Sequence, residues 1–413
     1  VRDALSGRAC HEVDLATALE PRISAPRLAA AGLHVIPTGI DHGTLTIIAA
    51  GAHFELTTFR RASPRDQSAF SQTIEEDLAG RDFTINALAF DLLRRRLIDP
   101  YGGAADLAAA RLRAVGCAAD RLREDPLRIL RMLRFGPGEG RACEPSLFEA
   151  ARGLGSLLSQ TAVERVRGEL ERILLTPQPA AALRMMRDLK LLEVVLPELS
   201  PAVGFEQNEF HIHDVYEHTL AVLEATPPDL ELRLAALFHD AGKPHTLSVD
   251  PQGRRHFFDH ETVSRRIARE AMTRLKFSHA QVECVAAIVA FHMRPLTCGP
   301  AGVRRLLRDL GPHFDRWLEF KIADVSPAAP PQALQREISG FRALLEAERE
   351  RLRDPAYGKL AINGRDLIAL GIAPGPELGR ILREIENLVI AVSYTHLRAH
   401  ETPEHLVCRL LLE

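Results

Sequence analysis

Short alternating runs of apolar and polar residues lie in the first hundred positions, and helical periodicity dominates the rest of the chain. Runs typical of strands occur at 45–48, 54–59 and 96–99, and the second alternates as a half-buried strand does. From about residue 105, apolar residues recur every three or four positions, as at Leu127, Leu130 and Leu133, which is typical of amphipathic helices. The pattern predicts an α+β fold, with an α/β head followed by helices.

Clusters of proline and glycine divide the helical part. Gly-Pro-Gly-Glu-Gly at 136–140 should end the helix that carries Phe135, Pro201 begins a new section, and the Pro- and Ala-rich stretch 327–331 predicts a linker. Asn363 opens a turn into a last helical unit. These breaks predict four folded segments, 1–104, 105–200, 201–326 and 327–391.

Composition favours a cytoplasmic enzyme over a secreted, membrane or generally basic protein. The 413 residues carry a net charge of -3, so any RNA contact must come from local basic patches. The six cysteines are scattered and form no Cys-x-x-Cys pair, which predicts free thiols in a reducing compartment. We see no signal peptide and no run near the roughly 18 apolar residues of a membrane helix.

Three carboxylates in the head, Glu12, Asp14 and Glu55, can hold divalent metal. Mg²⁺ prefers oxygen ligands shared between carboxylates and substrate phosphates, and two such ions can clamp both oxygens of a phosphoryl transfer. If Glu12-Val13-Asp14 is a strand, its two acidic side chains face the same side, and Glu55 lies on a neighbouring strand. Taken alone, an acidic pair of this kind is more often solvated surface.

A polar stripe starts at Asp125 and continues through Arg128, Arg131 and Arg134, on the opposite side from the leucines. Asp125 before Pro126 is also a good helix start, with Asp as N-cap and Pro at N1, and capping alone would explain both residues. An Asp that accepts from an exocyclic amine, beside an Arg that donates to the ring, imitates a Watson–Crick edge. Cytosine and adenine present an amine at this position of the Watson–Crick edge, whereas uracil and guanine do not.

Histidines and aspartates collect in the middle of the chain. Imidazoles and carboxylates drawn from several helices are the usual ligands of a metal-hydrolase site, although a single histidine at helical spacing is more often a core residue. The set occurs in the order His218, His239, Asp240, His260, His292, Asp324.

The ordered motifs resemble the bacterial CCA-adding tRNA nucleotidyltransferase and poly(A) polymerase family (class II nucleotidyltransferases), from residue 1 to about 390. The matching stretches are Val1–Arg8, Glu12–Thr17, Gly39–Thr44, Asp77–Ala87 and Glu124–Arg128. The resemblance implies a nucleotidyltransferase head (1–104) with a small mixed or antiparallel sheet, an all-α neck (105–200), an HD domain (201–326) and a helical tail (327–391). It also implies template-independent addition of C and A from CTP and ATP to the 3′ end of tRNA.

The resemblance assigns roles residue by residue. Asp14 and Glu12 would bind Mg²⁺, with Glu55 helping to position the ion that activates the 3′-hydroxyl. The tRNA would be held by its acceptor arm, and no membrane is implied. The expected nucleotide-binding residues are Arg2, Arg81, Asp82, Asp125, Arg128, Arg131 and Arg134.

The middle set resembles the HD superfamily of metal-dependent phosphohydrolases. By that match the core ligands are His218, His239, Asp240 and Asp324, and His260 and His292 can hold a second ion. The resemblance implies a transition metal (Ni²⁺, Co²⁺ or Mn²⁺) and hydrolysis of 2′,3′-cyclic phosphates or 2′-nucleotides.

Several positions depart from the family pattern. Glu12 replaces an Asp, Gly80 replaces the first Arg of Arg-Arg-Asp, and two glycines that precede Val1 in the family are missing. The stretch between Phe59 and Asp77 is shorter than usual, which favours CC addition, and 392–413 resembles a translated sequencing adaptor. Alternatives therefore stay open: a CC-only or A-adding enzyme, a poly(A) polymerase, or an HD phosphohydrolase whose head has decayed.

Overall fold

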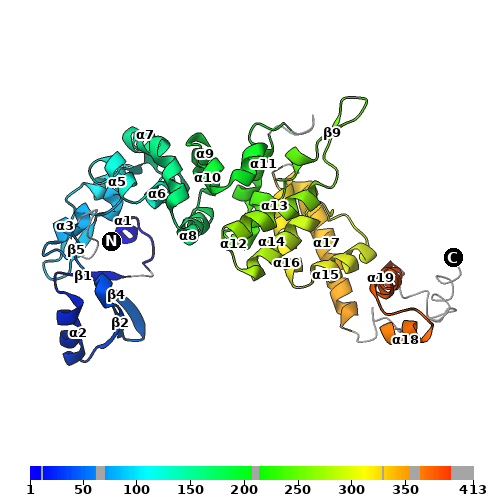
Figure 1. Ribbon diagram of the computed structural model, residues 1–413, viewed down its shortest axis with the longest axis horizontal. Coiled ribbons are helices and arrows are strands. Elements are labelled where there is room, and N and C mark those ends of the chain that lie inside the picture. The colour runs from blue at the N-terminus through cyan, green and yellow to red at the C-terminus, as the bar shows by residue number, and fades with distance from the viewer. Residues whose placement is uncertain (11–12, 62–69, 207–213, 328–329, 354–362, 392–413) are drawn as a thin grey trace. The chain divides into compact units, whose positions relative to one another are not determined.

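The computed structural model describes residues 1–10, 13–61, 70–206, 214–327, 330–353 and 363–391 (Figure 1). Contacts divide the chain into two units. The first comprises Val1–Val203 with Ala271–Phe277, and the second comprises Gly204–Glu270 with the described residues from Ser278 onward. Among the described residues, no helix is long and apolar enough to cross a membrane.

The head contains a four-stranded mixed sheet in the order β1-β4-β3-β2. The parallel pair is β1 (Asp14–Thr17) with β4 (Ala52–Thr58), and the antiparallel strands are β3 (Thr44–Ala49) and β2 (His34–Gly39). Ala50 and Gly51, both with positive φ, join β3 to β4 in the kind of two-residue turn that suits a twisted hairpin. The predicted α+β class and the strands at 45–48 and 54–59 are confirmed.

The strand predicted through Glu12 is not confirmed. Pairing with β4 begins at Asp14, opposite Glu55, so Val13 precedes the strand and Glu12 lies outside the described residues. The run at 96–99 forms β6 (Arg96–Ile98), which pairs with β5 (Ala89–Asp91). The head also contains α1 (Arg2–Leu5), α2 (Pro21–Ala30), α3 (Ile74–Ala79) and α4 (Gly103–Ala108).

A buried carboxylate joins the end of the head to the short parallel pair β7 (Arg111–Leu112) and β8 (Ala142–Cys143). Asp106 is fully buried and accepts hydrogen bonds from the Thr84 hydroxyl at 2.6 Å and from Arg111 and Arg113. Burial opposes its ionisation, but these three donors outweigh burial and lower the pKa of Asp106. The carboxylate therefore stays charged and holds three segments together.

The helices that follow match the predicted periodicity. Leu127, Leu130 and Leu133 are buried on α6 (Leu127–Phe135), which ends at Phe135 before the predicted glycine-rich break. Ile129 and Met132 are buried as well, because α6 is covered from more than one side, including by α8 (Val163–Leu174). The other helices here are α5 (Ala118–Glu124), α7 (Pro145–Leu154), α9 (Pro179–Asp188) and α10 (Leu192–Val195).

In its described residues, the second unit is built from helices with one short hairpin, β9 (Ser248–Val249) and β10 (Arg255–His256). Its core includes Trp317, whose ring packs against Phe314 and Phe341. Asn363 caps α18 with a capping box, as its turn predicted. The helices are α11 (Val215–Ala225), α12 (Leu230–Phe238), α13 (His260–Arg274), α14 (His279–Phe291), α15 (Pro300–Leu310), α16 (Phe314–Val325), α17 (Pro331–Leu352), α18 (Gly364–Ala369) and α19 (Pro376–Ala391). The 392–413 segment lies outside the described residues.

Candidate nucleotide and metal sites

Asp14 and Glu55 lie directly opposite each other on the parallel strands β1 and β4. Residues in register on adjacent strands project to the same face of a sheet, and both side chains are exposed. Within the described residues, neither carboxylate forms an ion pair or hydrogen bond, so their oxygens are available to a cation. The third expected ligand, Glu12, lies outside the described residues.

A pocket of about 510 Å³ lies between α6, α8 and the turn after α3. It brings together five of the seven expected nucleotide-binding residues: Arg81, Asp82, Asp125, Arg128 and Arg131. Five lining residues on α8 were not predicted, namely Glu164, Arg165, Gly168, Glu169 and Arg172.

Asp125 differs in detail from the predicted helix cap. Helix α6 begins at Leu127 with Pro126 in the cap position, and Asp125 is extended because a residue before proline is disfavoured in the helical region. Its Oδ1 still accepts from the Leu127 amide at 3.2 Å. Its Oδ2 accepts from Arg165 at 2.8 Å. The carboxylate is thus oriented on the pocket wall by one helix start and one arginine.

Arg128 is also held in place. Its guanidinium donates to Glu124 at 2.9 Å and to the carbonyl oxygens of Arg121 and Gly80. These contacts bridge α5, α6 and the turn after α3, so the arginine has little freedom to move. Arg81, on the same turn, pairs with Asp77 at 2.8 Å.

The remaining arginines of the stripe meet two buried carboxylates. Arg131 donates to Asp82 at 2.6 Å, and Asp82 also accepts from the Phe83 amide and from Asn86. Arg134 donates to buried Glu169 at 2.9 Å. Asp82 therefore has a clear structural role in orienting Arg131, besides any contact with substrate.

The ring of Phe135 gathers three of these cations. The guanidinium carbons of Arg2, Arg131 and Arg134 lie 4.7, 5.3 and 4.0 Å from its centroid, within the range of cation–π attraction. Arg2 also donates to Asn86 at 2.7 Å. Arg2 and Arg134 do not line the pocket but are connected through this ring to Arg131, which does.

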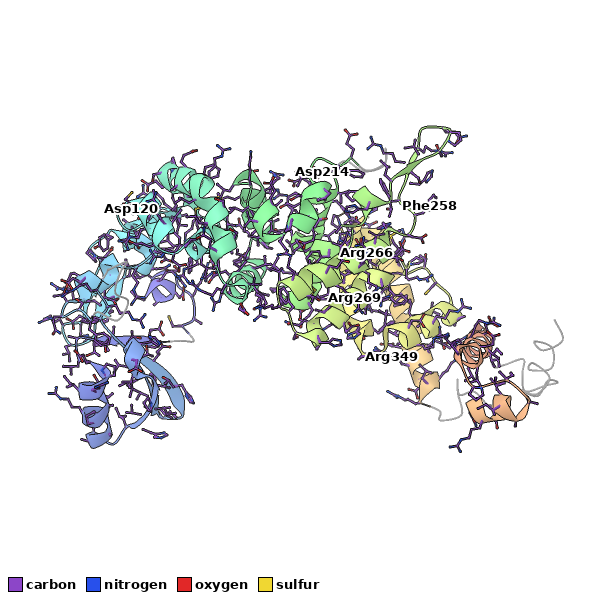
Figure 2. The ribbon with its side chains drawn as sticks, in the orientation of Figure 1. Asp120, Asp214, Phe258, Arg266, Arg269 and Arg349 are labelled. Carbon is purple, nitrogen blue, oxygen red and sulfur yellow. The ribbon has the colours of Figure 1, made fainter. Side chains whose placement is uncertain are left out.

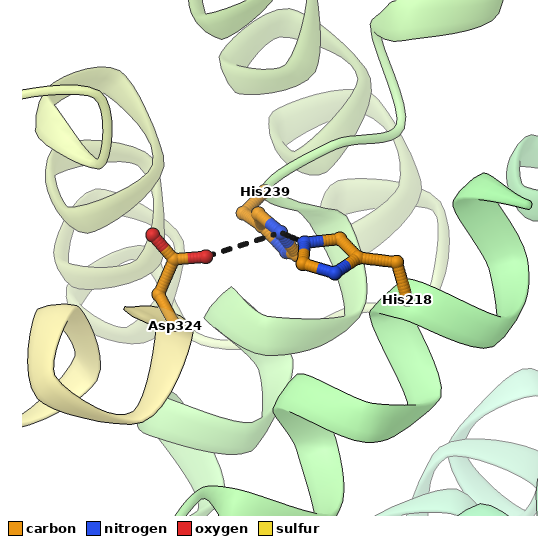
Figure 3. A group of neighbouring side chains, drawn as sticks. All are labelled: His218, His239 and Asp324. Atoms are coloured by element: carbon orange, nitrogen blue, oxygen red, sulfur yellow. Dashed lines mark hydrogen bonds and ion pairs between the residues drawn. The ribbon is translucent and has the colours of Figure 1, made fainter. Parts of the chain in front are cut away.

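All six predicted ligands of the middle set meet in the second unit. His218 lies on α11, His239 and Asp240 follow α12, His260 begins α13, His292 follows α14 and Asp324 lies on α16. Two groups of three have ligand atoms within 4.8 Å of one another, His218–His239–Asp324 and Asp240–His260–His292. Figure 3 shows the first group, with Asp324 reaching toward His239 at 3.5 Å.

Asp240 belongs to the second group and also contacts the first. Its Oδ2 is 3.2 Å from His239 Nε2, and its Oδ1 is 3.3 Å from His260 Nε2. Two buried ammonium groups lie against the carboxylates, Lys243 at 2.7 Å from Asp240 and Lys321 at 2.9 Å from Asp324. The centre is therefore dense in ligands and in charge.

The histidines are oriented for metal binding. Nδ1 of His239, His260 and His292 lies 2.7–2.9 Å from a backbone carbonyl three residues earlier, so Nδ1 carries the proton and Nε2 turns toward the centre. Burial lowers the pKa of His218 to about 4 and also lowers that of His292. Neutral imidazoles with Nε2 exposed to a shared centre suit a divalent transition metal.

Asp240 and His239 have pKa values that reflect their mutual contact. Burial opposes ionisation of Asp240, but His239 and Lys243 outweigh it and hold the pKa of Asp240 well below its usual value. Burial opposes protonation of His239, but Asp240 outweighs it and raises the pKa of His239. The contact with His239 thus favours the ionised carboxylate of Asp240, the form that binds a metal ion.

Three known family models match successive stretches of the chain. Residues 1–113 match the poly A polymerase head domain, 142–203 match the "Probable RNA and SrmB- binding site of polymerase A", and 215–309 match the HD domain. The A-adding tRNA nucleotidyltransferase of Deinococcus radiodurans is 38% identical over 76% of this chain and 74% of its own length. The chain belongs to the tRNA nucleotidyltransferase family.

Other tRNA nucleotidyltransferases are similar over nearly the whole chain. The CC-adding enzyme of Thermus thermophilus is 34% identical over 93% of this chain and 87% of its own length. The crystal structure of the Bacillus stearothermophilus CCA-adding enzyme in complex with CTP is 27% identical, with a TM-score of 0.70 over 94% of this chain and 86% of that chain. Membership of this family, with its HD domain, implies dependence on divalent metal.

The α8 residues were missed because their role depends on tertiary packing. Arg165, Glu169 and Arg172 are spaced by four and three residues, so they share one helix face. That spacing was a usable signal of a charged face. It could not reveal that the face meets the Asp125–Arg134 stripe, because α6 and α8 are separated by four other elements along the chain, β8 and α7 among them.

Proposed function

We propose that this chain adds C and A nucleotides from CTP and ATP to the 3′ end of tRNA without a template, in the cytoplasm. The observation that carries the proposal is the oriented pair Asp125 and Arg128 on the wall of a pocket large enough for a base and sugar. Asp125 would accept from the exocyclic amine of C or A, and Arg128 would donate to the ring beside it.

The head would carry out the transfer. Mg²⁺ bound by Asp14, Glu12 and the triphosphate would neutralise phosphate charge and activate the 3′-hydroxyl. Glu55, opposite Asp14, would help to position that ion. The 3′-hydroxyl would lose its proton to solvent as its oxygen attacks the α-phosphorus in line, and the new phosphodiester bond would form as the bond to the pyrophosphate leaving group breaks. Arg131, backed by Asp82, and Arg81 and Arg134 would hold the nucleotide, while Arg2 supports the same cluster through Phe135.

The proposal is tested by incubating the protein with Mg²⁺ and tRNA that lacks its 3′-terminal CCA, supplied with CTP alone, ATP alone, or both. Products are resolved at single-nucleotide resolution. Growth by C, C and A with both nucleotides supports the proposal. Growth by CC alone, by A alone on tRNA ending in CC, or by long A tails would each identify a narrower or different polymerase. No growth in any mixture would contradict polymerisation by this head.

Sequence similarity does not distinguish an enzyme that adds CCA from one that adds only CC or only A. The two relatives above carry the names A-adding and CC-adding, and each is about as similar to this chain as the other. The stretch between Phe59 and Asp77, which favoured CC addition, includes residues outside those described. Single-nucleotide incubations therefore decide the matter.

We propose a second activity, metal-dependent hydrolysis of 2′,3′-cyclic phosphates or 2′-nucleotides at the HD site. The supporting observation is that six ligand side chains lie around one centre, with three imidazoles oriented by backbone carbonyls. Ni²⁺, Co²⁺ or Mn²⁺ suits this donor set better than Mg²⁺ because imidazole dominates it. Assays of 2′,3′-cyclic AMP with each metal test the activity. Absence of hydrolysis with every metal would leave the centre a structural one.

A further inference from the structure

An aromatic ring stands exposed beside the HD site. Phe258 is 70% exposed, the largest exposure among the phenylalanines that the structure describes. It is the second residue after the β9/β10 hairpin, and it is labelled in Figure 2. Exposing a ring of this size leaves a large apolar surface in water, which burial in the core would have avoided.

The ring is held in a fixed orientation. It stacks on His256, with centroids 5.2 Å apart and planes at 8°. His256 Nε2 lies 3.1 Å from Asp250, which closes the hairpin across its two strands. Arg255 ties the hairpin to the backbone of Glu206 at 2.8 Å, next to the segment that leads into α11. One face of Phe258 is therefore covered by His256, and this contact restricts the orientation of the ring while its other face stays exposed.

The backbone connects this ring to the candidate metal centre over two residues. The carbonyl of Phe257 accepts from His260 Nδ1 at 2.7 Å, and Phe257 lies 5.9 Å from the Lys243 ammonium, which pairs with Asp240. Because two peptide units separate Phe258 from His260, their Cα atoms are at most about 7.6 Å apart. Asp259 between them has a φ of 58°, a left-handed turn that Asp tolerates and that lets His260 face inward while Phe258 faces out.

We propose that Phe258, backed by His256, is a stacking platform for the nucleobase of the HD-site substrate. Phe258 is two residues from the candidate ligand His260, so the base of a nucleotide whose phosphate binds at the centre would stack on this ring. The inference rests on the proposed phosphohydrolase and deepens it, since it specifies nucleobase-bearing phosphate esters, free or at an RNA end, as the substrate class. Stacking is tolerant of base identity because every base has a π-face, so little preference among bases is expected.

The first test compares substrates with and without a base. Wild type, Phe258→Leu, Phe258→Trp and the control Val249→Ala, an exposed residue of the same hairpin, are assayed with 2′,3′-cyclic AMP and with the 2,3-cyclic phosphate of methyl riboside. Phe258→Leu should raise the KM for cyclic AMP by about 5- to 100-fold, the range of base–aromatic stacking. It should leave the base-free substrate unchanged, and Phe258→Trp should behave as wild type.

A binding measurement tests stacking on Phe258 even if the protein does not hydrolyse the substrate. The 2′-monophosphate of 2-aminopurine riboside is titrated into the same four proteins without added metal, and its fluorescence is followed, since stacking quenches it. The head contributes the same background to every variant. Quenching lost in Phe258→Leu and kept in Phe258→Trp supports the platform even if no metal gives turnover. Equal quenching in all four proteins, or equal KM changes for both substrates, would overturn it.

Discussion

Asp125 and Arg165 form an ion pair of 2.8 Å on the wall of the pocket between α6 and α8, one just before α6 and the other on α8. The pair lies where base selection is proposed, and it is accessible to solvent, with side-chain exposures of 29% and 54%. Exposed pairs of this kind contribute about 0–1 kcal/mol to stability. The contact is therefore more important for the orientation of Asp125 than for the fold.

Arg165→Ala should lower the preference for CTP over UTP without lowering the stability of the fold. With Arg165 gone, Asp125 keeps only the Leu127 amide and can turn away from the exocyclic amine. We expect the preference for CTP over UTP, measured as a ratio of kcat/KM, to fall about tenfold, as loss of a hydrogen bond to a charged group would give. Arg123→Ala is the matched control, because Arg123 is an exposed arginine paired with Asp120 and does not line the pocket. An unchanged ratio would reduce Arg165 to a surface ion pair.

Asp125→Ala and Asp125→Asn should separate base reading from helix capping. Ala removes both, whereas Asn keeps an oxygen for the Leu127 amide but brings a donor where cytosine and adenine also donate. Both variants should let UTP or GTP compete with CTP, at a cost to CTP of about 1–3 kcal/mol. Only Ala should lower stability, by about 1 kcal/mol. If the CTP/UTP ratio stays constant while Ala alone lowers the melting temperature, Asp125 is a helix cap.

The sequence predicted which residues would lie together at the two candidate sites better than it predicted their contacts. Alternation at 54–59 was sufficient to place Glu55 on a strand beside Asp14, because a period of two fixes the face of every residue. The set from His218 to Asp324 was found by order and chemistry. Neither signal contains the packing of α6 on α8, so the sequence did not predict that Arg165 and Glu169 line the pocket. The strand begins at Asp14, later than predicted, because a strand extends only as far as its pairing with the neighbouring strand, which the sequence does not show.

Asp14→Ala and His239→Ala should affect different activities. Asp14 lies in the first unit and His239 in the second, so the first variant should abolish nucleotide addition and keep hydrolysis of 2′,3′-cyclic AMP, and the second should do the reverse. Circular dichroism checks that each variant is folded. Loss of both activities in a folded variant would contradict two independent sites.

Gly242→Ala should distort the candidate metal centre, because the added Cβ would push against the backbone at the start of α13. An added Cβ would lie 2.4 Å from the His260 carbonyl oxygen and 2.7 Å from the Ser264 amide. Both atoms belong to the start of α13, so no flexible side chain can yield. We expect a loss of stability of about 1–3 kcal/mol and weaker binding of Mn²⁺ by calorimetry. Gly340→Ala, with open space around its Cβ, is the control and should bind Mn²⁺ as wild type does. Unchanged binding in Gly242→Ala would show that α13 can move freely.

Asp106→Asn should destabilise the first unit in a pH-dependent way. The pKa of Asp106 is lowered in the folded chain, so its carboxylate contributes stability above the unfolded pKa of about 3.9, and that contribution is lost as pH falls through the folded pKa. At pH 7 the variant should lose about 3 kcal/mol, because a buried charge with two arginine partners is removed, and the deficit should shrink toward pH 3. Urea unfolding followed by far-UV circular dichroism measures this. The fluorescence of Trp317, the chain's one tryptophan, reports the second unit and should not shift. A deficit independent of pH would mean that the lost hydrogen bonds, and not the charge, hold these segments together.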